Sequence, residues 1–583
     1  MLRRINSKFL IVIIITLLLF AAGFYVYDLS YNSKTIQQTI SGPPYRGPEM
    51  ASSAQFPITD NMSLYTNDEN GKVIDIYVTM LKPDNPKYST LNDILAYKYN
   101  YTEVVEKPAA KAVFQIGNEN GPEMDMLGFD PKVANAIIEP RGRSTSASAY
   151  KSFKISLSDK VALWGGQKVL NLNFHPSDRS RIRNKLSFDF YELMPDITSL
   201  RTQFVRLHIK DNSEGAEGEF VEYGLFTHVE QVNKRYLSSH GLDGDGHLYK
   251  ANSFEFHRYM DVIKLKTDPS YDANAFNQVL DIRGNEDHSK LIDMLIDLND
   301  STKDIDDIIE AHFNRDNYLT WLASNIITGN SDTVSQNFIL YSPQAIKNWY
   351  FIPWDCDGAW GWAYEVLMIE GEERYAEWQY GIQNLWGSKL SNRFLRKKEN
   401  VEQLDQKIQE LMKLYNEERT NKFLTEYYPE VLKSQSTPEA LMKLRSSPTR
   451  FAESYNLLPT IPKKYYDIYV SSKQKPMPFF QNPVEMRDGS AYFSWGSSFD
   501  LQNDQLTYTL EVSKTPDMQT IVYTQKDLSK PEASADLESG TYYMKVRATD
   551  SQGNSMGAFD QFRDLDDVEY DGVREVKVEK PSE

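Results

Sequence analysis

Acidic and amide side chains gather in one short stretch near the middle of the chain. Asp332 is followed five positions later by Asn337, and a strand-like run of aromatic and apolar residues then ends in Asp355 and Asp357. A carboxylate can accept a proton from a reacting hydroxyl, and carboxylate and amide oxygens can hold a hard divalent cation. The pattern therefore indicates either a metal-binding catalytic site or an acidic loop beside a buried hairpin.

The D-x-x-x-x-N spacing of this stretch is also the spacing of the protein-kinase catalytic loop. In that loop the aspartate receives the proton of the acceptor hydroxyl and the asparagine holds a magnesium ion, while a following hairpin delivers a metal-binding aspartate. On this interpretation Asp332 is the proton acceptor, and Asn337 and Asp355 are metal ligands. Asp357 is either a second ligand or a structural partner.

The elements around the stretch are predicted to aim these side chains at one point. A helical pattern with Leu319, Leu322 and Ile326 on its buried face runs up to the stretch, so Asp332 falls in a loop just past the helix. The runs QNFILYS and NWYFIPWD read as two paired strands. Such a hairpin brings Asn337 and Asp355 to the same end of the sheet.

A second group of candidate residues lies about 190 positions earlier. Residues 139–157 read as a strand, a polar loop containing Gly142, and a second strand that carries Lys151. Backbone N–H groups of this hairpin, with Arg141 or Arg143, could cover nucleotide phosphates. Lys151 could reach the same phosphates, although a lysine on a strand is more often simply solvated.

The segment that follows, residues 175–194, looks helical and carries Asp189 and Glu192. One of these carboxylates could pair with the strand lysine, and a solvated helix face fits the spacing equally well. Glu230 lies where a hinge between two lobes is expected, and Glu192 and Glu230 are candidate residues of the nucleotide site.

Residues 73–81 alternate as a strand should, and residues 204–210 and 223–232 read as a further hairpin. This small sheet, the helix and the hairpin predict an N-terminal lobe, and the helical patterns after residue 390 predict a helical C-terminal lobe.

Composition narrows the class of protein. A chain of 583 residues is long enough for two to four domains. The formal net charge of −18 argues against nucleic acid as a partner, because no basic surplus exists to neutralise phosphates. Acidity could attract a basic substrate, or it could simply aid solubility. The single cysteine, Cys356, excludes an intrachain disulfide framework and a cysteine-built structural zinc site.

The N-terminus predicts a membrane anchor. Arg3, Arg4 and Lys8 precede an uncharged apolar run over residues 9–27, which as a helix spans roughly 28 Å. Basic residues on the N-terminal side predict a cytoplasmic N-terminus, with the rest of the chain outside a single-pass membrane anchor. A cleaved signal peptide is the competing interpretation, with an unusually long apolar region.

The domain organisation follows from these patterns and from a change of character near residue 474. Beyond that point, short alternating strands around Trp495 suggest a fibronectin type III-like sandwich, followed by a charged tail that could add a final strand. The predicted order is a cytoplasmic N-terminus over 1–8, a transmembrane anchor over 9–27, a linker over 28–62, a kinase-like domain over 63–460, the sandwich over 474–562 and the tail over 563–583.

Four blocks of the sequence resemble the bacterial spore-coat CotH kinase family, an atypical branch of the protein-kinase-like fold. The blocks are RGRSTSASAYKSFKISL, RIRNKLSFDFYELM, EYGLFTHVEQV, and SNIITGNSDTVSQNFILY together with FIPWDCDGAWG. The resemblance implies a Ser/Thr kinase that uses ATP and Mg²⁺ or Mn²⁺. It also implies Asp332 as the catalytic carboxylate, Asn337 and Asp355 as metal ligands, and Lys151 as the phosphate-binding lysine.

Together, pattern and resemblance predict an α+β fold: a two-lobed atypical kinase-like domain, an all-β fibronectin-like sandwich and a transmembrane helix. The expected function is transfer of the ATP γ-phosphate to Ser or Thr of a surface or coat protein, either Ser/Thr-rich or basic. Two alternatives remain open, namely a non-catalytic pseudokinase scaffold or adhesion protein, and an ATP-using enzyme that transfers AMP or ligates amino acids. A calcium-binding surface protein is a weaker third, since the acidic stretch lacks the ligand ladder of an EF-hand.

Overall fold

The structure is a computed structural model that describes residues 56–66, 71–100, 105–123, 133–159, 164–365, 375–435, 440 and 446–580. The transmembrane helix predicted over residues 9–27 lies outside these ranges. Among the described residues, no helix combines the length and the apolar character needed to cross a bilayer.

The N-terminal part of the described chain is an eight-stranded sheet that closes on itself. Its order is β1-β7-β8-β6-β5-β4-β2-β3, and β1 also pairs with β2. The strands are β1 (Val73–Met80), β2 (Ala110–Asn118), β3 (Gly121–Pro122), β4 (Ala136–Arg141), β5 (Ser152–Leu157), β6 (Val169–Asn173), β7 (Thr202–Asp211) and β8 (Phe220–Glu230). Because β1 contacts β7 on one side and β2 on the other, the sheet has the connectivity of a barrel.

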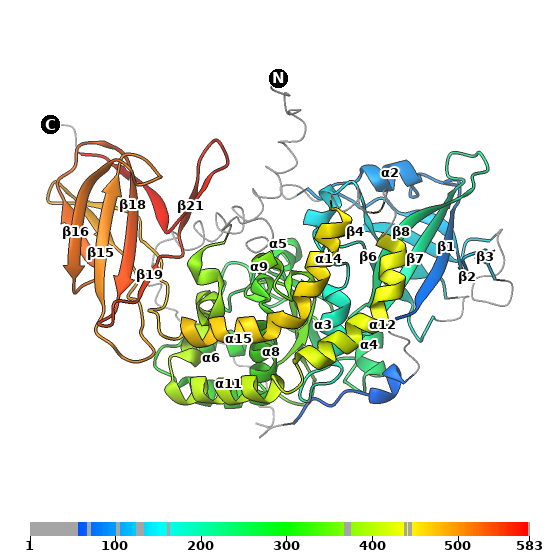
Figure 1. Cartoon of the computed structure of the whole chain (residues 1–583), viewed down its shortest axis with the longest axis horizontal. Coiled ribbons are helices and arrows are strands. Elements are labelled where there is room, and N and C mark those ends of the chain that lie inside the picture. Colours follow the sequence, from blue (N-terminus) through cyan, green and yellow to red (C-terminus); the bar gives the residue numbers. More distant parts are fainter. Residues whose placement is uncertain are drawn as a thin grey trace.

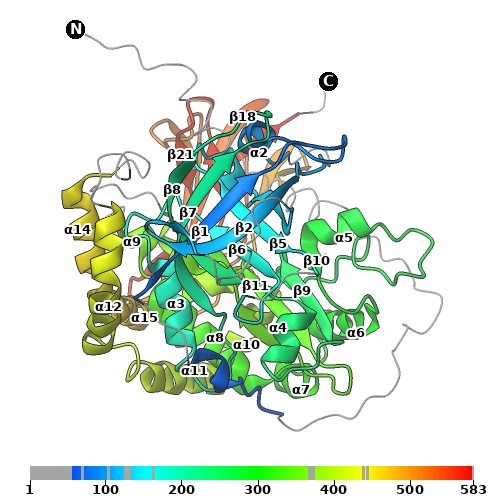
Figure 2. The same cartoon turned by 90° about the vertical axis from the view of Figure 1, so that its right-hand side faces the viewer.

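Strand β1 makes this closure possible because it is buried along most of its length. Ile76, Val78 and Met80 point into the apolar core of the closed sheet, together with Phe114 from β2. Its pairing with β7 is parallel, whereas its pairing with β2 is antiparallel. Figure 2 shows β1, β2 and β6 facing the viewer, with helix α3 (Arg183–Tyr191) below them.

The predicted fold class is wrong. The described chain is a mixed α/β structure with five separate sheets, and its largest sheet is closed and contains a parallel pair instead of forming a small N-terminal lobe sheet. No helix of the described part can span a membrane. The local strand and hairpin predictions are confirmed, including β4 with β5 and β7 with β8. The predicted fold class failed because it did not include the pairing of β1 with β7 and β2, strands that are distant from β1 in the sequence.

A four-stranded antiparallel sheet and a group of helices follow the closed sheet. The sheet has the order β10-β9-β11-β12 and is built from β9 (His247–Ala251), β10 (Leu280–Ile282), β11 (Phe338–Ser342) and β12 (Tyr350–Pro353). The main helices are α4 (Lys234–Ser239), α6 (Ser289–Asn299), α7 (Ile305–His312), α8 (Arg315–Thr328), α10 (Lys389–Leu395), α11 (Lys398–Leu411), α12 (Glu417–Gln435), α14 (Pro448–Leu457) and α15 (Ile461–Ser472). Helix α15 packs on α8, so the helical part continues past residue 460.

The C-terminal unit consists of strands only. Three sheets contain β13 (Glu485–Arg487), β14 (Ser490–Ser494), β15 (Thr507–Ser513), β16 (Ile521–Leu528), β17 (Glu532–Ala535), β18 (Gly540–Thr549), β19 (Ser555–Gly557), β20 (Gln561–Arg563), β21 (Glu569–Asp571) and β22 (Val573–Val578). Strand β22 pairs with β18, so the charged tail adds a strand as predicted. The likeness to fibronectin type III is not confirmed.

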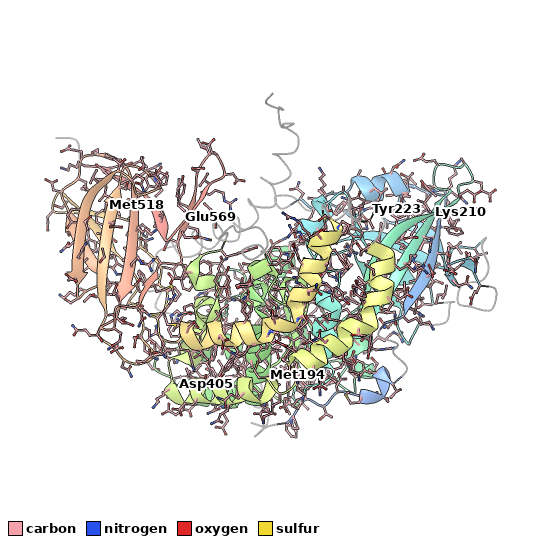
Figure 3. All side chains as sticks on the ribbon, viewed as in Figure 1. Met194, Lys210, Tyr223, Asp405, Met518 and Glu569 are labelled. Atoms are coloured by element: carbon pink, nitrogen blue, oxygen red, sulfur yellow. The ribbon has the colours of Figure 1, made fainter. Side chains whose placement is uncertain are left out.

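The C-terminal unit and the closed sheet lie at opposite ends of the molecule, with the helices between and beneath them (Figure 1). In Figure 3, Met518 labels the C-terminal unit and Lys210 labels the closed sheet. Aromatic contacts join the C-terminal unit to the helical part, including Phe559 against Trp378 with ring centroids 5.1 Å apart.

Candidate active site

Helix α8 delivers Asp332, as the helical pattern predicted. The helix ends at Gly329, which has a left-handed conformation with φ +61°. A side chain at this position would be strained, and a Cβ there would also overlap the ring of Tyr465 on α15. Asp332 follows in a single 3₁₀ turn, Ser331–Thr333, and is therefore held close to the end of a rigid, buried helix.

Two amide side chains hold the carboxylate of Asp332. Asn337 Nδ2 donates to Asp332 Oδ2 at 2.7 Å, and Gln336 Nε2 donates to Oδ1. Asn337 has a positive φ of 57°, a conformation that asparagine accepts more readily than most residues. Because its amide nitrogen is engaged with Asp332, its amide oxygen is the atom available to a metal ion.

The hairpin predicted to bring Asn337 and Asp355 together is confirmed. Strands β11 and β12 pair antiparallel with Phe338 opposite Pro353, so Asn337 and Asp355 flank the same end of the hairpin. Asn317 of α8 bonds both backbone groups of Phe351 in β12, at 2.6 and 3.1 Å. The helix that carries Asp332 is therefore tied directly to the strand that carries Asp355.

A sharp turn after β12 presents Asp355 and Asp357 to Asp332. Asp355 adopts a left-handed conformation with φ +54° and ψ +63°. A Cβ built on Gly358 would lie 3.2 Å from the Cβ of Asp332, so the absence of a side chain at Gly358 lets the turn approach closely. The spacing of these residues thus predicted a true cluster.

His175 joins this cluster and was not predicted from the sequence. Asn184 Oδ1 accepts the Cys356 N–H at 3.1 Å, so Asn184 Nδ2 is a donor and lies 2.9 Å from His175 Nε2. Nε2 is therefore an acceptor, and Nδ1 carries the proton that is donated to Asp357 Oδ2 at 3.0 Å. His175 thus orients Asp357.

The site has the donors that a divalent cation requires. Carboxylate oxygens of Asp355 and Asp357 lie within 4.8 Å of each other and of a ring nitrogen of His175, which orients Asp357 through its proton. Carboxylate and amide oxygens suit Mg²⁺ or Mn²⁺. The buried Oδ1 of Asn330, beside the same turn, has no hydrogen-bond partner in the described part of the chain. The residues present therefore fit the metal that the resemblance implies.

The pKa values of the clustered aspartates also favour a bound cation. Burial, together with the negative charges of Asp357 and Asp355, raises the pKa of Asp332 to about 7, against the opposing hydrogen bonds from Gln336 and Asn337. Burial and the charge of Asp357 also raise the pKa of Asp355. Carboxylates that disfavour each other's ionisation are stabilised by a cation placed between them.

Helix α3 is the platform beneath the acidic turn. Asn184 binds the backbone of Cys356, and Ser187 Oγ accepts from the Trp360 indole at 3.1 Å. Arg183, fully buried at the start of the helix, pairs with Asp178 at 2.6 Å and with Glu365. The helix was predicted, but over the longer range 175–194, and its observed role is to support the turn.

Of the cations predicted to meet the phosphates, Arg141 acts on the acidic cluster, whereas the Lys151 ammonium is bound elsewhere. Lys151 is buried, and its ammonium donates to the carbonyl oxygens of Tyr97, at 2.9 Å, and Ser146. The positive charges that act on Asp355 come instead from Arg141 and Lys250. Lys151 therefore anchors the hairpin loop internally.

Lys250 lies in the sheet whose strands β11 and β12 hold Asn337 and Asp355 at one end. In β9 it is paired with Ile339 of β11, and cross-strand partners share a face. Asn337 directly precedes β11 and has a left-handed φ of 57°, so it lies at the end of the strand that pairs with β9. Burial lowers the pKa of Lys250 to about 8, while the charge of Asp355 acts in the opposite direction.

Arg141 and Arg143 approach from the closed sheet. The Arg141 guanidinium lies 5.4 Å from the centroid of the Trp354 ring, directly before Asp355, and also donates to Asn173. Burial lowers its pKa to about 10, although Asp355 opposes this shift. The Arg143 guanidinium lies 5.4 Å from the Tyr99 ring centroid. Arg283, which sequence reasoning missed, adds a further positive charge felt by both Arg141 and Lys250.

The two glutamates predicted for the nucleotide site lie at the ends of β8 and α3. Glu230 is buried at the end of β8, where its Oε2 contacts His240 at 3.1 Å and accepts the Arg201 N–H at 3.2 Å. Glu192 is half-buried at the C-terminal end of α3. The other helix carboxylate, Asp189, pairs with Lys185 of the same helix at 3.0 Å. The predicted pairing with Lys151 is therefore not formed by Asp189.

Comparison with known proteins identifies related chains. The family described as CotH kinase protein matches residues 138–456, more than half of this chain and including the whole acidic cluster. The inner spore coat protein H of Bacillus subtilis (strain 168) is 25% identical over 261 residues, which cover 45% of this chain and 67% of that protein.

Proposed function

Because this chain belongs to the CotH kinase family, we propose that it is a metal-dependent phosphotransferase that moves the γ-phosphate of ATP to Ser or Thr of a coat or surface protein. The name of the Bacillus relative supports a coat location. The formal charge of −18 favours a basic acceptor segment.

Asp332 acts as proton acceptor in this proposal. The acceptor hydroxyl oxygen attacks the γ-phosphorus, its proton passes to a carboxylate oxygen of Asp332, and the bond from the γ-phosphorus to the bridging oxygen breaks to release ADP. Each carboxylate oxygen of Asp332 accepts one hydrogen bond, from the side-chain amide of Gln336 or of Asn337, and keeps a further lone pair that can take the proton. A divalent cation held by Asp355 and Asp357 would offset the negative charges that raise the pKa of Asp332 and would favour its ionised, proton-accepting form.

The remaining residues of the site bind the cation and orient the ATP phosphates. Asp355, Asp357 and the amide oxygen of Asn337 would hold a divalent cation, which neutralises phosphate charge when bound. Lys250 and Arg141 supply positive charge from the two sheets that face the acidic turn. Positioning and charge neutralisation provide most of the rate in such a transfer.

The observation that carries the proposal is the convergence of three chain segments on Asp332. Its carboxylate is held at 2.7 Å by Asn337, the turn at Gly358 approaches it closely, and Asp355 and Asp357 raise its pKa. A scaffold with no reaction to perform has no need to keep three carboxylates in a buried cluster, where their charges oppose one another.

The test uses ATP labelled separately at the α- and γ-phosphates, with the full chain, Mn²⁺ or Mg²⁺ and a basic Ser/Thr-rich protein. Transfer of γ-label alone supports the kinase, whereas transfer of α-label identifies AMP transfer on the same site. Asp332→Asn should lower the rate by about 10²- to 10⁴-fold while nucleotide binding persists. Nucleotide binding without any transfer, equal in wild type and Asp332→Asn, would indicate the non-catalytic scaffold.

A further inference from the structure

Three aspartates of the C-terminal unit form a second cluster, which does not depend on the proposed phosphotransferase. Asp500 and Asp504 lie in the loop between β14 and β15, and Asp550 directly follows β18. One carboxylate oxygen from each lies within 4.8 Å of the others. Asp500 is only 4% exposed and Asp550 only 6%. Loops far apart in the sequence are thus folded so that buried carboxylates meet.

One carboxylate oxygen of Asp500 accepts no hydrogen bond from the described residues. Its Oδ1 accepts the N–H groups of Gln502, at 2.8 Å, and Asp504, at 2.9 Å. Its Oδ2 is buried and has no hydrogen-bond partner within the described ranges. A buried, unpaired carboxylate oxygen is costly, and here it stands beside two further carboxylates. This atom therefore points to a ligand.

The missing ligand is a cation. No Lys or Arg of the described residues lies within ion-pair distance of Asp500, Asp504 or Asp550. Ser551 Oγ donates a hydrogen bond to Asp504 Oδ1 at 2.8 Å. Three like charges this close together favour a multivalent positive ion over a proton or a water molecule.

We propose that Asp500, Asp504 and Asp550 form a Ca²⁺ site. Calcium takes six to eight oxygen ligands in flexible geometry, and carboxylates carried on loops are its usual donors. The cluster opens onto a hollow lined by Ser498 and Asn503, where water can complete the coordination shell. Zinc is disfavoured because the group contains no His or Cys.

The site lies beside the junction between the C-terminal unit and the helices. Phe499, directly before Asp500, stacks on Trp386 with ring centroids 5.6 Å apart and lies under the Arg396 guanidinium at 4.8 Å. Its carbonyl accepts the Met477 N–H at 2.8 Å. Calcium bound to Asp500 would therefore order the loop that docks the C-terminal unit on the rest of the chain.

The test is a titration of chelator-treated full chain with TbCl₃, read as terbium luminescence sensitised by Tyr508, which lines the hollow. We expect saturable luminescence that CaCl₂ displaces. Asp500→Asn should weaken Tb³⁺ and Ca²⁺ binding at least tenfold, while its amide oxygen can still accept the two backbone N–H groups. Asp527→Asn, at an exposed position of the same unit with positive φ, is the matched control. Asp355→Asn removes the proposed active-site ligand, and the luminescence that remains in this variant should still depend on Asp500.

Thermal unfolding provides the second measurement. Ca²⁺ should raise the Tm of wild type and leave that of Asp500→Asn unchanged. In chelator, Asp500→Asn should melt at or above the wild-type temperature because one of three like charges is gone. Equal Tb³⁺ binding by wild type and Asp500→Asn overturns the proposal. Luminescence that disappears only in Asp355→Asn would also overturn the proposal. The absence of any Tb³⁺ luminescence in wild type would overturn it as well.

Discussion

At the scale of single residues, two lysines offer a direct test of which cation contacts the nucleotide. Lys250 pairs with β11 and feels the charge of Asp355, whereas the Lys151 ammonium is bound by two carbonyl oxygens. Lys250→Met should raise the KM for ATP by about 10- to 100-fold, the range expected for losing one charge-assisted contact. Steady-state kinetics over a range of ATP concentrations measures this change.

Lys151→Met is the matched comparison. It should lower the free energy of unfolding by about 1–3 kcal/mol, because two buried carbonyl groups lose their donor, while the KM of the folded enzyme stays near the wild-type value. Lys250→Arg should restore part of the ATP affinity. A KM raised by Lys151→Met and unaffected by Lys250→Met would contradict the assignment.

His175 provides a second residue-scale prediction, for metal affinity. His175→Ala removes the donor to Asp357 and should weaken Mn²⁺ binding by about 10- to 100-fold, as loss of an orienting partner commonly does. His175→Asn should recover much of the loss, since its amide nitrogen can replace Nδ1 and asparagine accepts the positive φ of 48°. Activity measured against Mn²⁺ concentration gives the affinity. Equal behaviour of the two variants would rule out the positioning role.

The spacing of residues predicted part of this site and missed the rest for a physical reason. Asp332, Asn337 and Asp355 are neighbours in sequence and are joined by one helix end and one hairpin, so local pattern places them together. His175 contacts Asp357 across 182 positions, and Lys250 reaches the site through a strand pairing. Neither contact produces a pattern among residues that are neighbours in the sequence.

At the scale of elements, helix α3 depends on Arg183. Its guanidinium is fully buried between Asp178 and Glu365, and Ser454 of α14 also binds Glu365 at 2.5 Å. Arg183→Met should lower the free energy of unfolding by about 3–5 kcal/mol, because two buried carboxylates lose their partner. Urea unfolding of the full chain measures the change. A loss below about 1 kcal/mol, the range of an exposed ion pair, would contradict it.

Elements also show where prediction from sequence reached its limit. Alternation of apolar residues predicted β1, the β4–β5 and β7–β8 hairpins and the β11–β12 hairpin. It did not predict that β1 pairs with β7 in parallel and with β2 on its other side. Strand order is set by contacts between residues that are distant in sequence, and local periodicity carries no record of them.

At the scale of the whole molecule, His240 joins the start of the described chain to the end of the closed sheet. Its Nδ1 lies 2.6 Å from Asp60 and its Nε2 3.1 Å from Glu230, and the side chain is fully buried. Burial alone would lower the pKa of His240, but the bonds to the two carboxylates outweigh it and raise the pKa from 6.5 to about 9. The native state therefore holds a proton there that the unfolded chain releases near pH 6.5.

The stability of the protein should consequently fall in alkaline solution. A raised native pKa contributes stability that is complete below pH 6.5 and is lost as the pH rises through about 9, amounting to about 3 kcal/mol. His240→Gln cannot carry the charge, so its free energy of unfolding should lack this decline. Urea unfolding at intervals across this pH range, with Asp527→Asn as a control that should follow wild type, measures the difference. Parallel wild-type and His240→Gln profiles would show that the Asp60–His240–Glu230 contact does not govern stability.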